Sequence, residues 1–292
     1  MGIIDTENDR LILIRGGGEL ASGAGWILTK AGFRVLMTEV PHPLMVRWPV
    51  CFGTAVSTGR WQVEGIWAEL VTRTNEGSAA ERQALETDKA VLERIKTSFE
   101  RGEIPILIDP QLQYLEMLKP KVVVDAIIAK RNTGTKKTMA SLTIGLGPGF
   151  RAGTDVHAVV ETNRGHNLGR LIYEGSAEPN TGIPGVIGGI SAERVVYSPI
   201  SGVFRPQREI GQRVKAGDVL GILENQGSKA EAKARIDGVL RGLLRAGTFV
   251  EENVKVGDVD PRGQERYCWT ISEKARAVGS AVLLCVMENF RL

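Results

Sequence analysis

Three consecutive glycines carry the clearest chemical signal in this 292-residue chain. Gly16, Gly17 and Gly18 follow the apolar run of residues 11–14 and precede an amphipathic segment, in which Ala21 keeps the third small position of a dinucleotide-binding turn. In such a turn one glycine allows the bend, the next lets a phosphate approach the backbone, and a small residue lets helix and strand pack closely. The spacing therefore predicts a phosphate-binding turn, and a turn that only begins the sheet is the alternative.

An acidic residue follows the glycines at the separation that ribose recognition requires. Residues 34–38 form a second, largely apolar run that ends at Glu39. Folds of this kind place an acid about 20 residues after the glycines, where it hydrogen-bonds the ribose hydroxyls. Glu39 is therefore predicted to complete a nucleotide site together with the glycine turn.

Further along the chain, polar and cationic residues are candidates for binding the anionic remainder of such a ligand. Asp125 ends another buried apolar run, and Lys130 lies in the basic turn that follows it. A second transition from an apolar run to glycines contains Gly147 and Gly149, whose backbone amides could form an anion-binding nest. Helix capping and a solvated loop are the alternatives for these segments.

The glycine- and arginine-rich segment 163–189 has the least ordinary composition. Arg164, His166 and Arg170 lie between glycines, where two guanidinium groups could clamp an acidic ligand and the imidazole could exchange a proton. Polar loops of this kind suit a binding site better than a core, although a long structural connector has the same composition. No pair of nucleophile and base can be placed from the sequence, so no catalytic residue is assigned.

The elements that must position these residues predict an α/β fold. Apolar runs alternate with helical patterns through residue 130, which predicts a Rossmann-like parallel sheet with helices on its faces. Residues 1–150 are therefore assigned to a Rossmann-like nucleotide-binding domain, and 151–193 to a glycine-rich polar connector that carries binding loops. Residues 263–292 are predicted to form a strand and a helix that pack back on the first domain.

Residues 194–262 contain an internal repeat that predicts a small β-barrel. The sequence around Gly202 recurs around Gly238, and a Gly-Asp turn follows each copy. The pattern resembles the biotinyl/lipoyl-type domain, in which the hairpin between the two halves carries a modified lysine. Gly227 occupies that position here, so the barrel is predicted to be a docking or lid module without a carrier lysine.

Composition and charge argue against several classes of function. The net charge is +3 and no basic run interleaves with aromatic residues, so nucleic-acid binding is not expected. No run approaches the ~18 apolar residues that span a membrane, and the N-terminus lacks a signal-peptide pattern, which predicts a cytoplasmic protein. The three cysteines and three histidines are scattered, so neither a disulfide nor a metal site is predicted.

Six motifs that occur in a fixed order make the chain similar to a known family. The motifs are Arg15-Gly-Gly-Gly-Glu-Leu-Ala-Ser-Gly, Asp125-Ala-Ile-Ile-Ala-Lys-Arg-Asn, Gly145-Leu-Gly-Pro-Gly-Phe, Arg164-Gly-His-Asn-Leu-Gly-Arg, Asn180-Thr-Gly-Ile-Pro-Gly and Asp260-Pro-Arg-Gly. They cover nearly the whole chain, which thereby resembles the YqeB-like family of accessory proteins of the selenium-dependent molybdenum hydroxylase system. The family often has Asp where this chain has Glu19, a difference that keeps the carboxylate.

The resemblance implies an accessory protein that matures, or inserts cofactor into, a selenium-dependent molybdenum hydroxylase, with the hydroxylase apoprotein as its partner. The nucleotide-type ligand is then expected to be molybdopterin dinucleotide, and NAD(P) is the other candidate cofactor. Two alternatives stay open: an NAD(P)-dependent oxidoreductase with His166 as proton donor, and a non-catalytic scaffold with an empty Rossmann-like turn. The sequence decides neither whether the protein is an enzyme nor its oligomeric state.

Overall fold

The computed structural model describes residues 11–72 and 88–289, which form two compact units. Unit 1 comprises Met1–Pro43, Phe52–Pro179 and Ser272–Leu292, and unit 2 comprises Leu44–Cys51 and Asn180–Ile271. Each unit is therefore assembled from segments that are far apart in the sequence. The predicted domain boundaries at residues 150, 193 and 262 stay predictions.

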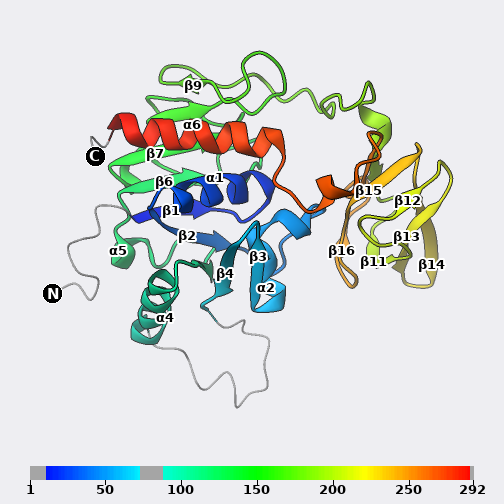
Figure 1. The fold of residues 1–292 in the computed structure, drawn as a ribbon, viewed down its shortest axis with the longest axis horizontal. Helices are drawn as coiled ribbons and strands as arrows, with labels where there is room; N and C mark the ends of the chain where they lie inside the picture. The colour runs from blue at the N-terminus through cyan, green and yellow to red at the C-terminus, as the bar shows by residue number, and fades with distance from the viewer. Residues whose placement is uncertain (1–10, 73–87, 290–292) are drawn as a thin grey trace. The chain divides into compact units, whose positions relative to one another are not determined.

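Unit 1 is built on a nine-stranded mixed sheet of order β3-β4-β5-β2-β1-β6-β7-β8-β9 (Figure 1). Its strands are β1 (Leu11–Arg15), β2 (Arg34–Glu39), β3 (Arg60–Val63), β4 (Ile66–Leu70), β5 (Ile104–Ile108), β6 (Val122–Asp125), β7 (Leu142–Leu146), β8 (Ala158–Val160) and β9 (Leu171–Ile172). The neighbouring strands from β4 to β8 pair in parallel. The two edge strands, β3 and β9, pair antiparallel with their neighbours.

Helices cover both faces of this sheet (Figure 1). They are α1 (Glu19–Lys30), α2 (Ala55–Thr58), α4 (Asp88–Glu100), α5 (Leu115–Leu118) and α6 (Glu273–Asn289), with the 3-10 turns η3 (Phe52–Thr54) and η4 (Lys137–Met139). Helices α1 and α6 pack against each other on one face, and α4 lies on the other. Among the described residues, the last helix thus packs against the first.

The central strand β1 is apolar on both of its faces because both faces are covered. Every residue of β1 is buried. Leu11 and Leu13 belong to the same core cluster as Ile95 of α4, whereas a Cβ on Gly25 of α1 would lie 3.7 Å from a methyl group of Ile14. A strand between two helical layers needs an uninterrupted apolar run rather than an alternating pattern.

Unit 2 contains two four-stranded antiparallel sheets, of order β10-β17-β15-β12 and β14-β13-β11-β16. Its strands are β10 (Val195–Tyr197), β11 (Gly202–Pro206), β12 (Arg213–Val214), β13 (Val219–Asn225), β14 (Ser228–Lys233), β15 (Gly238–Leu243), β16 (Phe249–Val250) and β17 (Lys255–Asp260). The 3-10 turns are η2 (Trp48–Val50), η5 (Ala192–Arg194) and η6 (Glu265–Cys268). Phe204, Leu220 and Leu240 lie in one core cluster, so the two sheets share a core.

The predicted fold class, a Rossmann-like parallel sheet followed by a biotinyl/lipoyl-like barrel, was wrong. The large sheet is mixed, and unit 2 consists of two antiparallel sheets that also include β10, which precedes the repeat. Strands β3 and β9 have only 4 and 2 residues, too few for their sequence to indicate pairing direction. The repeat indicated strands correctly, but β11 and β15 belong to different sheets, and a repeat carries no information on pairing.

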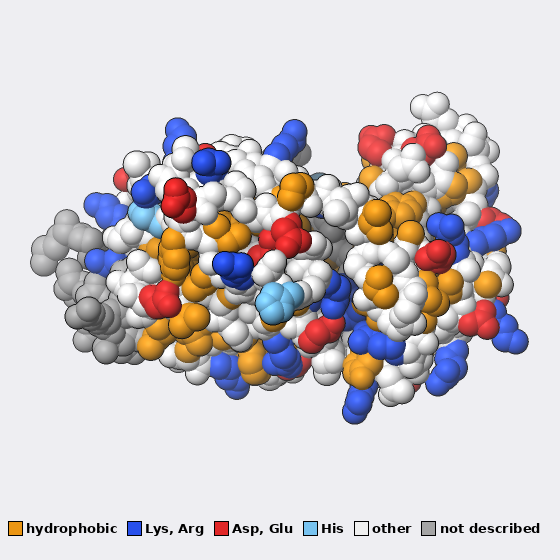
Figure 2. All heavy atoms as spheres, turned by 90° about the horizontal axis from the view of Figure 1, so that it is seen from above, with side chains coloured by type: hydrophobic (Ala, Val, Ile, Leu, Met, Phe, Trp, Pro, Cys, Tyr) orange, Lys and Arg blue, Asp and Glu red, His pale blue; other side chains and the backbone are white. Residues whose placement is uncertain are grey.

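Charges of both signs are mixed on the face that Figure 2 shows. Figure 2 shows a face on which Lys and Arg side chains are interspersed with Asp and Glu side chains and with apolar ones. None of the helices described is long and apolar enough to cross a membrane. The cytoplasmic location and the absence of nucleic-acid binding stay predictions.

Candidate functional site

Most of the predicted site residues lie at one edge of the sheet of unit 1, beyond the carboxyl ends of its parallel strands. These are Gly16, Gly17 and Gly18 after β1, Glu39 at the end of β2, Asp125 at the end of β6, Lys130 in the loop that follows, and Gly147 and Gly149 after β7. Strand β2 pairs with one side of β1, and β6, which comes later in the chain, pairs with its other side. The strand order therefore reverses at β1. Open α/β sheets bind ligands at such a reversal.

Each glycine of the turn has a different structural environment. Gly16 has a φ of +97°, which favours glycine. A Cβ on Gly17 would lie 2.7 Å from the Cα of Gly53, so only glycine fits. Gly18, in contrast, has a φ of −70°, and a Cβ there would meet no atom within 4 Å. The fold therefore requires glycine at positions 16 and 17 but not at position 18.

The Glu39 carboxylate holds the glycine turn through two backbone hydrogen bonds. Its Oε1 accepts one from the Gly17 N–H at 2.7 Å, and its Oε2 accepts one from the Val40 N–H at 2.9 Å. Burial raises the pKa of Glu39, and these two backbone donors counteract part of that rise. The side chain is half-buried, and each carboxylate oxygen keeps capacity for a further donor, such as a ligand hydroxyl.

Asp125 lies in a buried network rather than on the surface of the edge. Its Oδ2 is 3.0 Å from Nη1 of Arg15 and accepts a hydrogen bond from the Thr135 hydroxyl at 2.6 Å. Its Oδ1 accepts a hydrogen bond from the Ile127 N–H at 3.2 Å, and Arg15 also donates to the Thr135 hydroxyl. This network anchors the loop that follows β6. A direct contact of Asp125 with a ligand stays a prediction.

Three loops meet at this edge of the sheet. A Cβ on Gly16 would lie 3.1 Å from the Ala126 carbonyl oxygen, and a Cβ on Gly149 would lie 2.6 Å from the Arg131 nitrogen. The loop after β6, which carries exposed Lys130, therefore packs against both the glycine turn and the loop after β7. Gly147 has a φ of +77°. The glycines at 147 and 149 thus allow the loops to approach one another, and their role in anion binding stays a prediction.

The arginine-rich segment lies elsewhere, after β8, which β6 and β7 separate from β1. Arg164 forms an ion pair with Glu273 in the first turn of α6, and His166 is exposed. Arg170 lines a pocket of about 390 Å³. The structure therefore divides the predicted residues between two places instead of gathering them in one site.

The pocket contains residues that the sequence analysis missed. Glu161 follows β8 directly, and its carboxylate accepts hydrogen bonds from the Asn163 N–H at 2.6 Å and the Glu178 N–H at 2.7 Å. An acid that ends a buried strand is the signal that pointed to Glu39 and Asp125, and it could have found Glu161 as well. Glu178 is 17 residues away from Glu161 in the sequence, and no local pattern joins the two.

The described residues contain no cluster of metal ligands, and burial acts on two of their three thiols. Within residues 11–72 and 88–289, no three His, Cys, Asp or Glu side chains are grouped so that they could hold a metal ion. Burial raises the pKa of the Cys268 thiol, and it raises the pKa of Cys285 to about 11. Both thiols are therefore predominantly protonated near neutral pH.

No family model matches the chain. It is 45% identical over 278 residues to the uncharacterized protein YqeB of Escherichia coli (strain K12), an alignment that covers 95% of this chain and 47% of that protein. The chain is a homologue of YqeB. It spans about half the length of this relative. The identity supports the resemblance to the YqeB-like family, whereas a role beside a molybdenum hydroxylase is not part of that finding.

Similar solved structures have much lower identity. An aspartoacylase family protein from Mesorhizobium loti is 11% identical, with 85% of this chain and 84% of that chain covered and a TM-score of 0.26. A succinylglutamate desuccinylase/aspartoacylase from Rhodobacter sphaeroides is 16% identical, with 86% of this chain and 85% of that chain covered and a TM-score of 0.27. The ectoine utilization protein EutE (DoeB) from Ruegeria pomeroyi is 12% identical, with 85% of each chain covered and a TM-score of 0.24. Similarity at this level assigns neither a reaction nor a substrate to this chain.

The predicted functions, a molybdenum hydroxylase maturation factor or an NAD(P)-dependent oxidoreductase, were wrong. Of the solved structures named above, one is an aspartoacylase family protein and one a succinylglutamate desuccinylase/aspartoacylase, and no molybdenum hydroxylase factor or NAD(P)-dependent oxidoreductase stands among them. The alternative of a non-catalytic scaffold stays a prediction. The physical reason for the error lies in the turn on which these predictions depended. The fold itself requires glycine at positions 16 and 17, and it uses Glu39 to accept a hydrogen bond from the Gly17 N–H. The motif alone therefore does not specify a dinucleotide. The hydroxylase apoprotein as partner stays an untested prediction.

Proposed function

We propose that unit 1 binds a small phosphate-bearing molecule at the carboxyl edge of its sheet, with the phosphate in front of the first turn of α1. Gly18 is the observation that supports this function. The backbone conformation and the surroundings of Gly18 would both accept a side chain, yet the residue is glycine. Glycine at this position leaves open the space that a phosphate needs in order to reach backbone amides.

The chemistry around Gly18 suits a phosphate. Gly18 is the N-cap of α1 and has no side chain that could accept hydrogen bonds from the first amides of the helix. The N-terminus of a helix carries a partial positive charge of about 0.5 elementary charge, which favours an anion. Glu39 lies beside the turn with capacity to accept hydrogen bonds from hydroxyl groups of the same ligand. A phosphorylated molecule with hydroxyl groups fits both features.

Titration calorimetry of the full chain with ribose 5-phosphate, inorganic phosphate and uncharged ribose tests this function. We expect both phosphates to bind more tightly than ribose, and ribose 5-phosphate to bind more tightly than inorganic phosphate because only the former reaches Glu39. Gly18→Val should weaken phosphate binding at least about tenfold, since its side chain fills the space in front of the helix.

Ala31→Val is the matched control, because it adds the same kind of side chain at the exposed opposite end of α1. It should bind like the wild type, and thermal unfolding should show both variants folded. Equal phosphate affinity of Gly18→Val and the wild type would exclude the proposed site, as would a wild type that binds none of the phosphates.

A further inference from the structure

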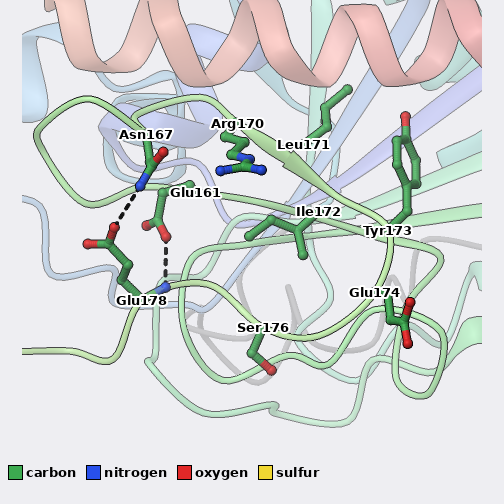
Figure 3. A pocket seen from close by; sticks show the side chains of 9 residues that line it. All are labelled: Glu161, Asn167, Arg170, Leu171, Ile172, Tyr173, Glu174, Ser176 and Glu178. Carbon is green, nitrogen blue, oxygen red and sulfur yellow. Dashed lines mark hydrogen bonds between the residues drawn. The ribbon is translucent and has the colours of Figure 1, made fainter.

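We infer that a second site in unit 1, the pocket beside β9, binds a zwitterionic amino acid with an apolar side chain. The residues that line this pocket of about 390 Å³ include Glu161, Arg170, Leu171, Ile172, Glu174 and Glu178 (Figure 3). The inference does not depend on the proposed phosphate site, because β6 and β7 lie between β8 and the glycine turn.

Arg170 supplies the cationic group of this pocket. Its backbone is fixed on both sides, since its N–H donates to the Asn167 carbonyl at 2.8 Å and its carbonyl accepts from the Glu161 N–H at 2.9 Å. Figure 3 shows the guanidinium group within the ring of lining side chains. This group forms no hydrogen bond or ion pair with any residue that the structure describes. A guanidinium without a protein partner can donate two parallel hydrogen bonds to the two oxygens of a ligand carboxylate.

Glu178 supplies an exposed carboxylate that two side-chain amides orient. Its Oε2 accepts a hydrogen bond from the Asn163 side-chain amide at 2.6 Å, and its Oε1 accepts one from that of Asn167 at 3.1 Å. These amide donors lower the pKa of Glu178. Its backbone N–H is held by Glu161 in turn. The pocket therefore presents a carboxylate that is oriented before a ligand arrives.

The balance of charge favours a ligand that carries both signs. The carboxylates of Glu161, Glu174 and Glu178 outnumber the guanidinium of Arg170. A simple anion would pair with Arg170 but would be repelled by the acids, and a simple cation would leave the guanidinium without a carboxylate. An α-amino acid satisfies both groups, with its carboxylate on Arg170 and its ammonium on the acids.

Two apolar residues of the pocket favour an apolar side chain on the ligand. Leu171 and Ile172 of β9 are half-buried and line the pocket with apolar surface. An aliphatic ligand side chain would cover these groups and remove their apolar surface from water, which favours binding. Leucine therefore represents the ligand class well.

Titration calorimetry of the full chain with L-leucine tests this inference. We expect saturable binding, and we expect 4-methylpentanoate and 3-methylbutylamine to bind at least about tenfold more weakly, because each lacks one of the two charged groups. Equal binding of leucine and either analogue would overturn recognition of a zwitterion, and a wild type that does not bind leucine would overturn the inference outright.

Variants locate the site. Arg170→Gln keeps a polar side chain but loses the cation, and it should weaken leucine binding by about 10- to 100-fold. Arg208→Gln, an exposed arginine of unit 2, is the matched control and should bind leucine like the wild type. Gly18→Val should also leave leucine binding unchanged, so failure of this site and failure of the phosphate site are distinguishable. Wild-type affinity in a folded Arg170→Gln protein would show that leucine binds elsewhere.

Discussion

At the scale of single residues, two acids that the sequence predicts as ligand groups hold the loops at the carboxyl edge of the sheet. Glu39 and Asp125 were predicted because each ends a buried strand, and both lie at the predicted edge. The sequence could not show their hydrogen-bond partners, because Thr135, Arg15 and the Gly17 amide reach them only in the folded chain. A strand-end acid therefore predicts a location more reliably than it predicts a role.

Removal of the Asp125 carboxylate should destabilise the fold strongly. Asp125→Ala leaves the buried Arg15 guanidinium without its carboxylate, and breaking a buried pair in this way costs about 3–5 kcal/mol of the free energy of unfolding. Urea denaturation measures the loss. The double variant Arg15→Met, Asp125→Ala leaves no uncompensated charge and should be more stable than Asp125→Ala alone. A loss below about 1 kcal/mol in Asp125→Ala would show that the network contributes little.

Glu39 should make the stability of the protein depend on pH. Burial raises its pKa above the ordinary value of 4.5, so the folded chain binds this proton more tightly than the unfolded chain does. The contribution of Glu39 to stability is therefore present in acid and is lost as the pH rises from about 4.5 through the folded-state pKa. Glu39→Gln cannot titrate. The stability of the wild type relative to Glu39→Gln should fall over this range in urea denaturation, and a rise would refute the assigned direction.

At the scale of elements, the close crossing of α1 and α6 fixes the helical layer behind the glycine turn. A Cβ on Gly279 of α6 would lie 2.8 Å from the Gly23 carbonyl oxygen of α1, and a Cβ on Gly23 would lie 2.6 Å from the Ala275 carbonyl oxygen. The two backbones therefore touch. The sequence predicted a strand, a glycine turn and a helix over residues 11–30 and a helix near the C-terminus, and the structure has all of them. The two helices lie near opposite ends of the described residues, so no local sequence pattern indicates that they pack together.

An alanine at this crossing should separate the helices. Gly279→Ala places its methyl group against backbone atoms that cannot rotate away, and overpacking of this kind costs about 1–3 kcal/mol. Thermal and urea unfolding measure the change. The neighbouring variant Ser280→Ala is the control, since Ser280 is exposed and should tolerate the change within about 0.5 kcal/mol. Equal stability of the two variants would contradict the close crossing.

At the scale of the whole molecule, the assignment of segments to units could not be read from the sequence. Residues 44–51 belong to unit 2 although unit 1 contains the residues on either side of them. One of the contacts that place them there is a hydrogen bond from the Leu243 N–H to the Val46 carbonyl at 2.8 Å, which joins residues almost 200 positions apart. Patterns of period two or 3.6 report which residues form a strand or a helix. They do not report which distant segment completes a sheet.

The central claim is that a phosphate binds in front of the first turn of α1, and the amide groups of that turn report on it directly. In the ¹⁵N-labelled full chain, titration with ribose 5-phosphate should shift the amide resonances of Gly18, Glu19 and Leu20 in a saturable manner, because these N–H groups lie where the phosphate is proposed to bind. The same resonances should stay in place in Gly18→Val. Saturable shifts confined to other parts of the chain, with these three amides unmoved in the wild type, would contradict the proposed function.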